Sequence, residues 1–133
     1  MKALDTNVLV RFLTGDDHAQ STRVAVLFRG AESTGERFHV SSLVVLELIW
    51  VLESLYKYRR EEILTAVGNM LALPVLSLEG PDVIEGFLGA AEGSKADLSD
   101  ILIGFSSKAQ DCETTLTFDK KAAKETALFR PLT

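Results

Sequence analysis

The sequence predicts an α/β fold in which a parallel sheet is covered by helices on both faces. Short apolar segments of strand length alternate along the 133 residues with longer segments of helical periodicity. Parallel strands need a helix-length connection between them, so this alternation favours a parallel sheet over an antiparallel one. The length suits one domain, and we expect a single domain spanning residues 1–133.

Five apolar segments are predicted to be strands, the last with the weakest pattern: Lys2–Leu4, Phe38–Val40, Pro74–Leu78, Thr114–Phe118 and Ala127–Pro131. Seven longer segments are predicted to be helices: Asn7–Leu13, Ala19–Glu32, Ser42–Tyr56, Glu61–Leu73, Pro81–Ala91, Leu98–Gln110 and Lys120–Thr126. Turn residues mark several boundaries. Gly15 and Asp16 separate the first two helices, and Pro74 cannot continue the helix before it. Gly80 and Pro81 turn the chain into the next helix, with proline in its first turn.

Composition narrows the class of protein. Hydrophobic residues make up 47% and charged residues 25%, as in a globular domain. The net charge of −5 argues against nucleic-acid binding through bulk positive charge, but it allows a few local Lys or Arg contacts. The single cysteine, Cys112, excludes an intrachain disulfide and is expected to be a small buried side chain. The chain start has no apolar signal segment and the longest apolar run, Leu43 to Leu52, is too short to cross a bilayer, so we expect a cytoplasmic protein.

Two aspartates follow predicted strands and precede predicted helices. Asp5 follows the first strand, and Asp119 repeats the arrangement after Phe118. The carboxyl ends of parallel strands lie at one edge of a sheet, where ligands of open α/β folds bind. The two side chains are therefore expected to point into the same crevice, and the alternative for each is a helix N-cap.

Glu47 interrupts the apolar run from Leu43 to Leu52. On a helix its face neighbours include Leu43 and Trp50, so no polar stripe exists for it to occupy. A buried, unpaired carboxylate is costly, and Glu47 should therefore find a cation, a hydrogen-bond donor or a proton. The alternative is a carboxylate that reaches solvent from the rim of the helix.

Asp97 and Asp100 share one face of a predicted helix at spacing i, i+3. Asp100 is the deeper of the two in the first turn and is expected to aim inward, with Gly104 leaving space beside it. Asp97 is expected to cap the helix and also to touch the site. The alternative is that the two residues are a paired helix cap with favourable interactions with the helix dipole.

The four carboxylates Asp5, Glu47, Asp100 and Asp119 are candidates for one acidic site. Anions that converge on one crevice repel one another, and a divalent cation removes that penalty. Oxygen ligands without clustered Cys or His select Mg²⁺ or Mn²⁺ rather than zinc. Such an ion suits phosphodiester hydrolysis, because it polarises a phosphoryl oxygen and lowers the pKa of water.

Four segments of the sequence together resemble the PIN-domain ribonucleases, specifically the VapC-type toxins of bacterial toxin–antitoxin pairs: Leu4 to Arg11, Ser41 to Glu47, Ala96 to Ile103 and Thr115 to Lys121. The resemblance covers nearly the whole chain. It implies a three-layer α/β/α fold with a parallel sheet of about five strands in the order 3-2-1-4-5. It also implies an Mg²⁺-dependent endoribonuclease that cuts structured RNA such as transfer or ribosomal RNA, forms homodimers and is blocked by a cognate antitoxin protein.

The resemblance also assigns roles to individual residues. It implies that the acidic metal ligands are Asp5, Glu47, Asp100 and Asp119, with Asp97 as a frequent fifth acid. It implies that the site is supported by hydrogen bonds from Thr6, Asn7 and Thr117. Near these acids, the candidates for contact with the RNA backbone are Arg11, Lys120, Lys121 and Lys124, for which the alternative is an ordinary solvated face.

Two other functions are compatible with an acidic α/β domain. A signalling receiver domain also places acids around Mg²⁺, but its phospho-accepting Asp follows the third strand, where this chain has Glu79 and Gly80. A PIN fold that only binds a partner and no longer cuts RNA is the other alternative, and the intact set of acids argues against it.

Overall fold

Two compact units, Met1–Glu79 and Gly80–Thr133, make up the chain, whose computed structural model describes all of residues 1–133. Each unit is described by itself. All seven predicted helices and all five predicted strands are present, with ends that differ by a few residues. None of the helices combines the length and the apolar character needed to span a bilayer.

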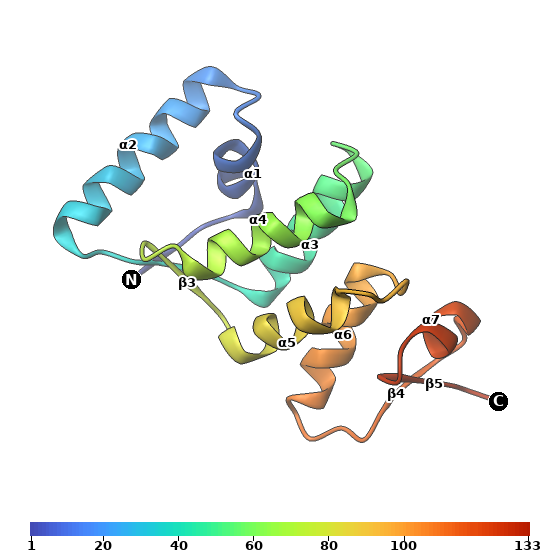
Figure 1. Cartoon of the computed structure of the whole chain (residues 1–133). Helices are drawn as coiled ribbons and strands as arrows, with labels where there is room; N and C mark the ends of the chain where they lie inside the picture. The colour runs from blue at the N-terminus through green and yellow to red at the C-terminus, as the bar shows by residue number, and fades with distance from the viewer. The chain divides into compact units, whose positions relative to one another are not determined.

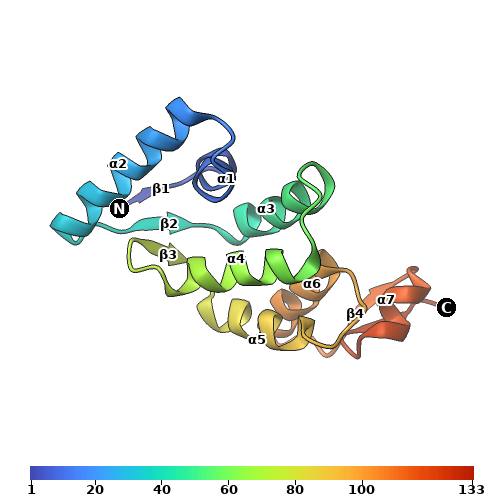
Figure 2. The same ribbon diagram turned by 45° about the horizontal axis from the view of Figure 1, so that its top comes forward.

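The first unit is built on three parallel strands with two helices after each of the first two strands. Its elements are β1 (Lys2–Ala3), α1 (Thr6–Thr14), α2 (His18–Thr34), β2 (Phe38–Val40), α3 (Ser42–Ser54), α4 (Arg60–Ala72) and β3 (Leu76–Leu78). β2 is the central strand, with Phe38 opposite both Lys2 and Leu76 (Figure 2). The helix α1 packs against α2 and α3, and α4 packs against α3 and β3.

Local sequence explains where these helices begin and end. Gly15 ends α1 in the left-handed conformation, with φ 64°, which glycine adopts at little cost. Asp17 caps α2 by accepting a hydrogen bond from the backbone N–H of Gln20 at 3.0 Å. The buried face of α3 consists of four apolar side chains spaced by three, one and three residues: Val45, Leu48, Ile49 and Leu52.

A polar network joins the turn after α1 to the turn after α3. The Arg11 guanidinium lies 3.1 Å from the Asp16 carboxylate and donates hydrogen bonds to Gln20 and to the Tyr56 hydroxyl. The Tyr56 hydroxyl in turn donates to Asp16 at 2.6 Å. The hydrogen bond from Tyr56 is the main reason that the pKa of Asp16 is lowered. Arg11 therefore has three protein partners within the first unit.

The second unit contains a helix pair and a small two-stranded parallel sheet (Figure 1). Its elements are α5 (Pro81–Ala91), α6 (Leu98–Lys108), β4 (Thr115–Thr117), α7 (Lys120–Glu125) and β5 (Phe129–Pro131). β4 and β5 pair in register, with Thr115 opposite Phe129. The helix α7 connects the two strands, as expected of a parallel pair.

Two glycines allow close packing inside the second unit. A Cβ atom on Gly86 of α5 would lie 2.8 Å from the ring of Phe105, so α5 and α6 meet directly at this point. A Cβ on Gly104 of α6 would lie 2.8 Å from Cβ of Leu128 and 3.2 Å from the ring of Phe129. The expected space beside Gly104 is therefore filled, because the segment entering β5 packs onto it.

The predicted strand order is confirmed within each unit, as 3-2-1 in the first and 4-5 in the second. The pairing of β1 with β4 that would join them stays a prediction, as does the single domain. The expectation that Cys112 is buried is wrong, because the thiol lies in the turn between α6 and β4 and is exposed.

Candidate metal-binding carboxylates

Asp5 is the N-cap of α1 and directly follows the strand β1 and Leu4. Its Oδ1 accepts a hydrogen bond from the backbone N–H of Thr6 at 2.8 Å, and its backbone carbonyl accepts from the N–H of Val8. The side chain is exposed, and Oδ2 accepts no hydrogen bond. The N-cap alternative is therefore confirmed, and it leaves one carboxylate oxygen free to bind a ligand.

The residues next to Asp5 differ in their surroundings. The Thr6 side chain is 3% exposed, and its Oγ1 has no hydrogen-bond partner in the protein. A buried hydroxyl without a partner is uncommon and costly. Asn7 is exposed. Thr6, the next residue after Asp5, thus supplies a buried polar atom that no protein group uses.

The expectation that Glu47 is buried in the apolar run is wrong. Its side chain is exposed on α3, on the same face as Leu43 and Trp50, which are 78% and 54% exposed. The apolar run covers the whole circumference of the helix, so periodicity could not tell which face enters the core. The carboxylate has no protein hydrogen bond or ion pair. Because α1 and α3 pack together, Asp5 and Glu47 lie on neighbouring helices.

The first turn of α3 is held by two side chains, one of which the sequence reasoning missed. Ser41 is the N-cap and accepts a hydrogen bond from the N–H of Val44 at 3.2 Å. Glu79, directly after β3, accepts one from the N–H of Ser42 at 2.8 Å. No motif could have identified Glu79, since the contact joins residues that are far apart in the chain.

Asp97 and Asp100 occupy the first turn of α6. Asp97 is exposed and is the N-cap, and its Oδ1 accepts a hydrogen bond from the N–H of Asp100 at 3.2 Å. Asp100 is half-buried beside the buried side chains of Ile101 and Leu102. The Asp100 carboxylate itself makes no hydrogen bond, so nothing in the second unit neutralises its charge.

Asp119 follows β4 and is the N-cap of α7. Its Oδ1 accepts hydrogen bonds from the N–H groups of Lys121 at 2.9 Å and Ala122 at 3.1 Å. Its own N–H donates to Oγ1 of Thr117 at 2.9 Å, so Thr117 fixes the backbone at this position. Oδ2 of Asp119 accepts no hydrogen bond. The local arrangement matches that of Asp5 at the end of β1.

The electrostatics of the second unit single out Asp100. Burial raises the pKa of this carboxyl, and the nearby carboxylates of Asp97 and Asp119 raise it further. No positively charged side chain offsets them. The structure therefore brings Asp97, Asp100 and Asp119 within electrostatic range of one another. Their mutual repulsion is the situation that a bound cation relieves.

The chemistry of these donors fits a hard divalent cation. Every candidate is a carboxylate or a hydroxyl, and no cysteine or histidine lies among them. Neither unit by itself gathers three His, Cys, Asp or Glu side chains into a group able to hold a metal ion. Asp5 and Glu47 belong to the first unit, and Asp100 and Asp119 to the second. A site built from all four residues stays a prediction.

The candidate RNA-binding residues fall into two groups. Lys120, Lys121 and Lys124 on α7 are exposed and make no ion pair, and they follow Asp119 directly. Arg11 is half-buried and bound to Asp16, Gln20 and Tyr56. The three lysines are therefore the freer cations.

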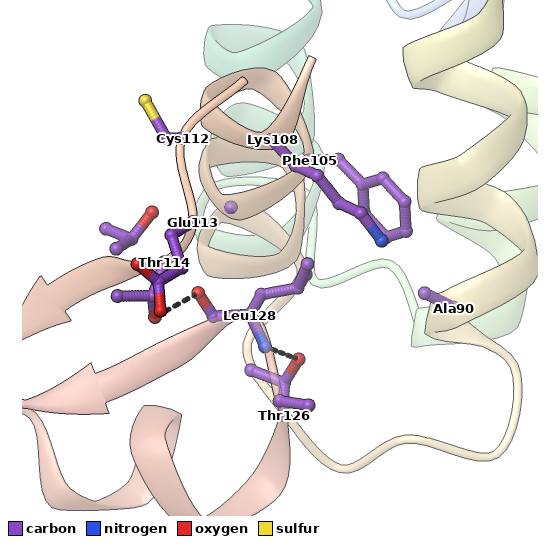
Figure 3. A pocket seen from close by; sticks show the side chains of 11 residues that line it. Ala90, Phe105, Lys108, Cys112, Glu113, Thr114, Thr126 and Leu128 are labelled. Carbon is purple, nitrogen blue, oxygen red and sulfur yellow. Dashed lines mark hydrogen bonds between the residues drawn. The ribbon is translucent and has the colours of Figure 1, made fainter. Parts of the chain in front are cut away.

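The second unit also contains an open pocket (Figure 3). It is lined by the last turn of α6, including Phe105 and Lys108, and by Glu113 and Thr114 before β4. Asp100 and Asp119 lie at the opposite ends of α6 and β4. Thr114 Oγ1 donates to the carbonyl of Leu128 across the pocket wall at 3.4 Å. None of the candidate carboxylates lines this pocket.

Parallel strands followed by helices with acidic N-caps define an α/β protein with carboxylate side chains at the ends of strands. The sequence model of the PIN domain family matches residues 2–127, and the chain belongs to that family. The chain is also similar to a protein named VapC ribonuclease from Aquifex aeolicus (strain VF5). The two are 27% identical over 124 residues, which cover 93% of this chain and 91% of the relative. No solved structure matches the chain significantly.

Proposed function

We propose that this protein is a metal-dependent endoribonuclease that uses Mg²⁺ or Mn²⁺ and acts as the toxin of a toxin–antitoxin pair. Membership of the PIN domain family and the similarity to a VapC ribonuclease support a nuclease. The observation that carries the proposal is that Asp97, Asp100 and Asp119, at the starts of α6 and α7, lie within electrostatic range of one another with no positively charged side chain to balance them. Such a concentration of carboxylates is typical of a site for a divalent ion.

The proposed ligands are Asp5, Glu47, Asp100 and Asp119, with Asp97 as a fifth acid. In Asp5 and Asp119 the backbone N–H groups hold Oδ1, which orients the free Oδ2 for binding. Hydrogen bonds to a metal ligand from groups that do not touch the metal commonly orient that ligand. The Thr117 hydroxyl supports the Asp119 cap by accepting a hydrogen bond from its N–H. The buried Thr6 hydroxyl has no protein partner and is available to support the proposed site.

The proposed hydrolysis depends on the charge of a bound ion and on the carboxylates around it. The chemistry that a divalent ion supplies when bound is positive charge at the scissile phosphate and acidification of water. Positive charge near Asp100 lowers the pKa of this carboxyl and so opposes the increase caused by burial and by Asp97 and Asp119. A carboxylate that accepts a hydrogen bond from the attacking water orients it in line with the leaving oxygen. The expected products carry 5′-phosphate and 3′-hydroxyl ends.

The proposed partners are a structured RNA, such as transfer or ribosomal RNA, a cognate antitoxin and a second copy of the chain. Because the net charge is −5, contact with RNA must be local. The exposed Lys120, Lys121 and Lys124 are the first candidates, and Arg11 is a further one whose guanidinium already has protein partners.

The decisive experiment compares two helix N-cap variants of the first unit. Asp5→Asn keeps a capping side chain but removes a proposed ligand charge, and it should reduce Mg²⁺-dependent cleavage of total RNA by more than about 100-fold. Asp17→Asn, at the N-cap of α2, is the matched control and should cleave like the wild type. EDTA should stop cleavage by the wild type. Cleavage by Asp5→Asn at the wild-type rate, or cleavage that survives EDTA, would refute the proposal.

A further inference from the structure

The first turn of α3 is fixed from outside its own helix. Two backbone N–H groups of this turn have no partner inside the helix and bond to side chains outside it. The N–H of Val44 donates to Oγ of Ser41, and the N–H of Ser42 donates to Oε1 of Glu79 at 2.8 Å. Helix N-termini leave such N–H groups without partners inside the helix. Glu79 therefore supplies one of the two side-chain bonds that determine where α3 begins.

Glu79 is also tied to the sheet. Its backbone N–H donates to the carbonyl of Val40 at 2.9 Å and continues the β2–β3 pairing by one residue. Only Ser41 separates the end of β2 from the start of α3. Glu79, the residue after β3, thus links the edge of the sheet to the first turn of α3, the helix that follows β2.

The charged form of Glu79 is the form that makes this contact. The hydrogen bond from the Ser42 backbone is the largest of the causes that lower the pKa of Glu79, and His39 on β2 contributes with the same sign. A carboxylate at a helix N-terminus is also favoured by the helix dipole. Glu79 is therefore held in its ionised state at the start of α3.

Glu47 lies on α3, one turn after the residues that these bonds hold. Cα–Cβ bonds in a helix tilt toward the N-terminus, so the Glu47 side chain leaves α3 over the turn that contains Leu43 and Val44. That turn is the one held by Glu79 and Ser41. Glu47 has no hydrogen bond of its own to fix its direction.

We propose that Glu79 is a positioning residue for Glu47, which it orients by fixing the first turn of α3 to the edge of the sheet. The inference rests on the proposed function, because it assumes that Glu47 is a metal ligand. Outer contacts that orient metal ligands are typically worth a factor of about 10 to 100 in affinity or activity. We expect an effect at the low end, since Glu79 acts through the backbone.

The test compares Glu79→Ala and Glu79→Gln with a matched control. In α4, Glu62 accepts a hydrogen bond from the N–H of Arg59 at 2.9 Å, and that bond is the main reason its pKa is lowered. Glu62→Ala therefore removes the same kind of contact from a helix that carries no proposed ligand. Binding of Mn²⁺ alone, kcat and KM for one RNA, and amide hydrogen exchange in α3 are measured for all variants.

Glu79→Ala should weaken Mn²⁺ binding by about tenfold and lower kcat more than it raises KM, with faster exchange of the amides of Ser42 and Leu43. Glu79→Gln keeps an acceptor oxygen and should recover most of the loss. Glu62→Ala should lower the melting temperature to a similar extent while Mn²⁺ binding and kcat stay at the wild-type values. The inference would be overturned if Glu79→Ala and Glu62→Ala lost Mn²⁺ affinity and kcat equally. It would also be overturned if Glu79→Ala bound Mn²⁺ as the wild type does.

Failure of the proposed function gives a different result. A wild-type protein that binds no Mn²⁺ and cuts no RNA would refute the nuclease and, with it, a metal-related role for Glu79. If the wild type binds Mn²⁺ and cuts RNA, and Glu79→Ala does both equally well, only the positioning role is refuted.

Discussion

At the scale of single residues, Asp100 is a proposed metal ligand whose charge lowers the free energy of unfolding of the metal-free protein. Its pKa is raised by burial and by the charges of Asp97 and Asp119, so the folded state binds a proton more tightly than the unfolded state does. The stability that follows from this proton is present at low pH and is lost as the pH rises through the raised pKa. At neutral pH the ionised carboxylate therefore destabilises the metal-free protein.

Asp100→Asn should consequently stabilise the metal-free protein while it abolishes function. In EDTA at pH 7 we expect the melting temperature to rise by a few degrees, and this gain should shrink as the pH falls through the carboxyl range. RNA cleavage in Mg²⁺ should drop by more than about 100-fold. Thermal unfolding between pH 3 and 8, at intervals of about one unit, measures the effect. A variant less stable than the wild type at pH 7 would contradict this account.

Residue by residue, the sequence was informative where local rules apply. Asp5, Asp97 and Asp119 could be placed at helix starts because capping depends on neighbouring residues, and all three are N-caps. The exposure of Glu47 could not be predicted, because every residue near it in the helix is apolar. The contact of Glu79 with Ser42 is tertiary and carries no local signal.

At the scale of elements, the packing of α6 against the segment that enters β5 depends on one glycine. Gly104→Ala would place its Cβ 2.8 Å from Cβ of Leu128, which is too close unless the backbone shifts. We expect a loss of about 1–3 kcal/mol in the free energy of unfolding. Urea denaturation monitored by circular dichroism measures it.

Gly89→Ala on α5 is the matched control, because nothing lies within 4 Å of the position a Cβ would take. Alanine favours a helix over glycine, so this variant should be unchanged or more stable by up to about 1 kcal/mol. A Gly104→Ala variant as stable as Gly89→Ala would show that the close approach of Leu128 is not maintained in solution.

The ends of helices and strands were predicted correctly where local sequence sets them, and incorrectly where a tertiary contact does. The helix from Pro81 to Ala91 and the strand from Phe38 to Val40 were predicted to the residue, because Pro81 starts one and the turn after Thr34 precedes the other. The helix expected to reach Tyr56 ends at Ser54, because Tyr56 turns away to bond Asp16. That hydrogen bond spans 40 residues, beyond the reach of any local pattern.

At the scale of the whole molecule, the proposed function requires an acidic protein to bind an acidic polymer. The net charge is −5, and the exposed cations near a proposed ligand are concentrated in α7. Replacing Lys120, Lys121 and Lys124 together by alanine should raise KM for RNA and leave the Mg²⁺ dependence unchanged. Each lost phosphate contact reduces the salt dependence of log affinity by about 0.7 for single-stranded RNA, so the slope should fall by up to about 2.

A triple variant with the same charge change tests whether α7 is special. Arg23, Arg29 and Lys57 are exposed in the first unit and were not proposed to contact RNA. Their replacement by alanine should alter KM and the salt slope much less. Equal effects from the two triple variants would indicate that only the net charge matters, and would remove α7 from the proposed RNA surface.

The position of Trp50 has a practical consequence. It is the only tryptophan of the chain, it is about half exposed, and it lies one turn from Glu47 on α3. Indole emission depends on local polarity and on nearby charge, so the protein carries an intrinsic optical reporter beside a proposed ligand. Titrations with cations, oligonucleotides or a protein inhibitor can therefore be followed by fluorescence in the unlabelled wild type.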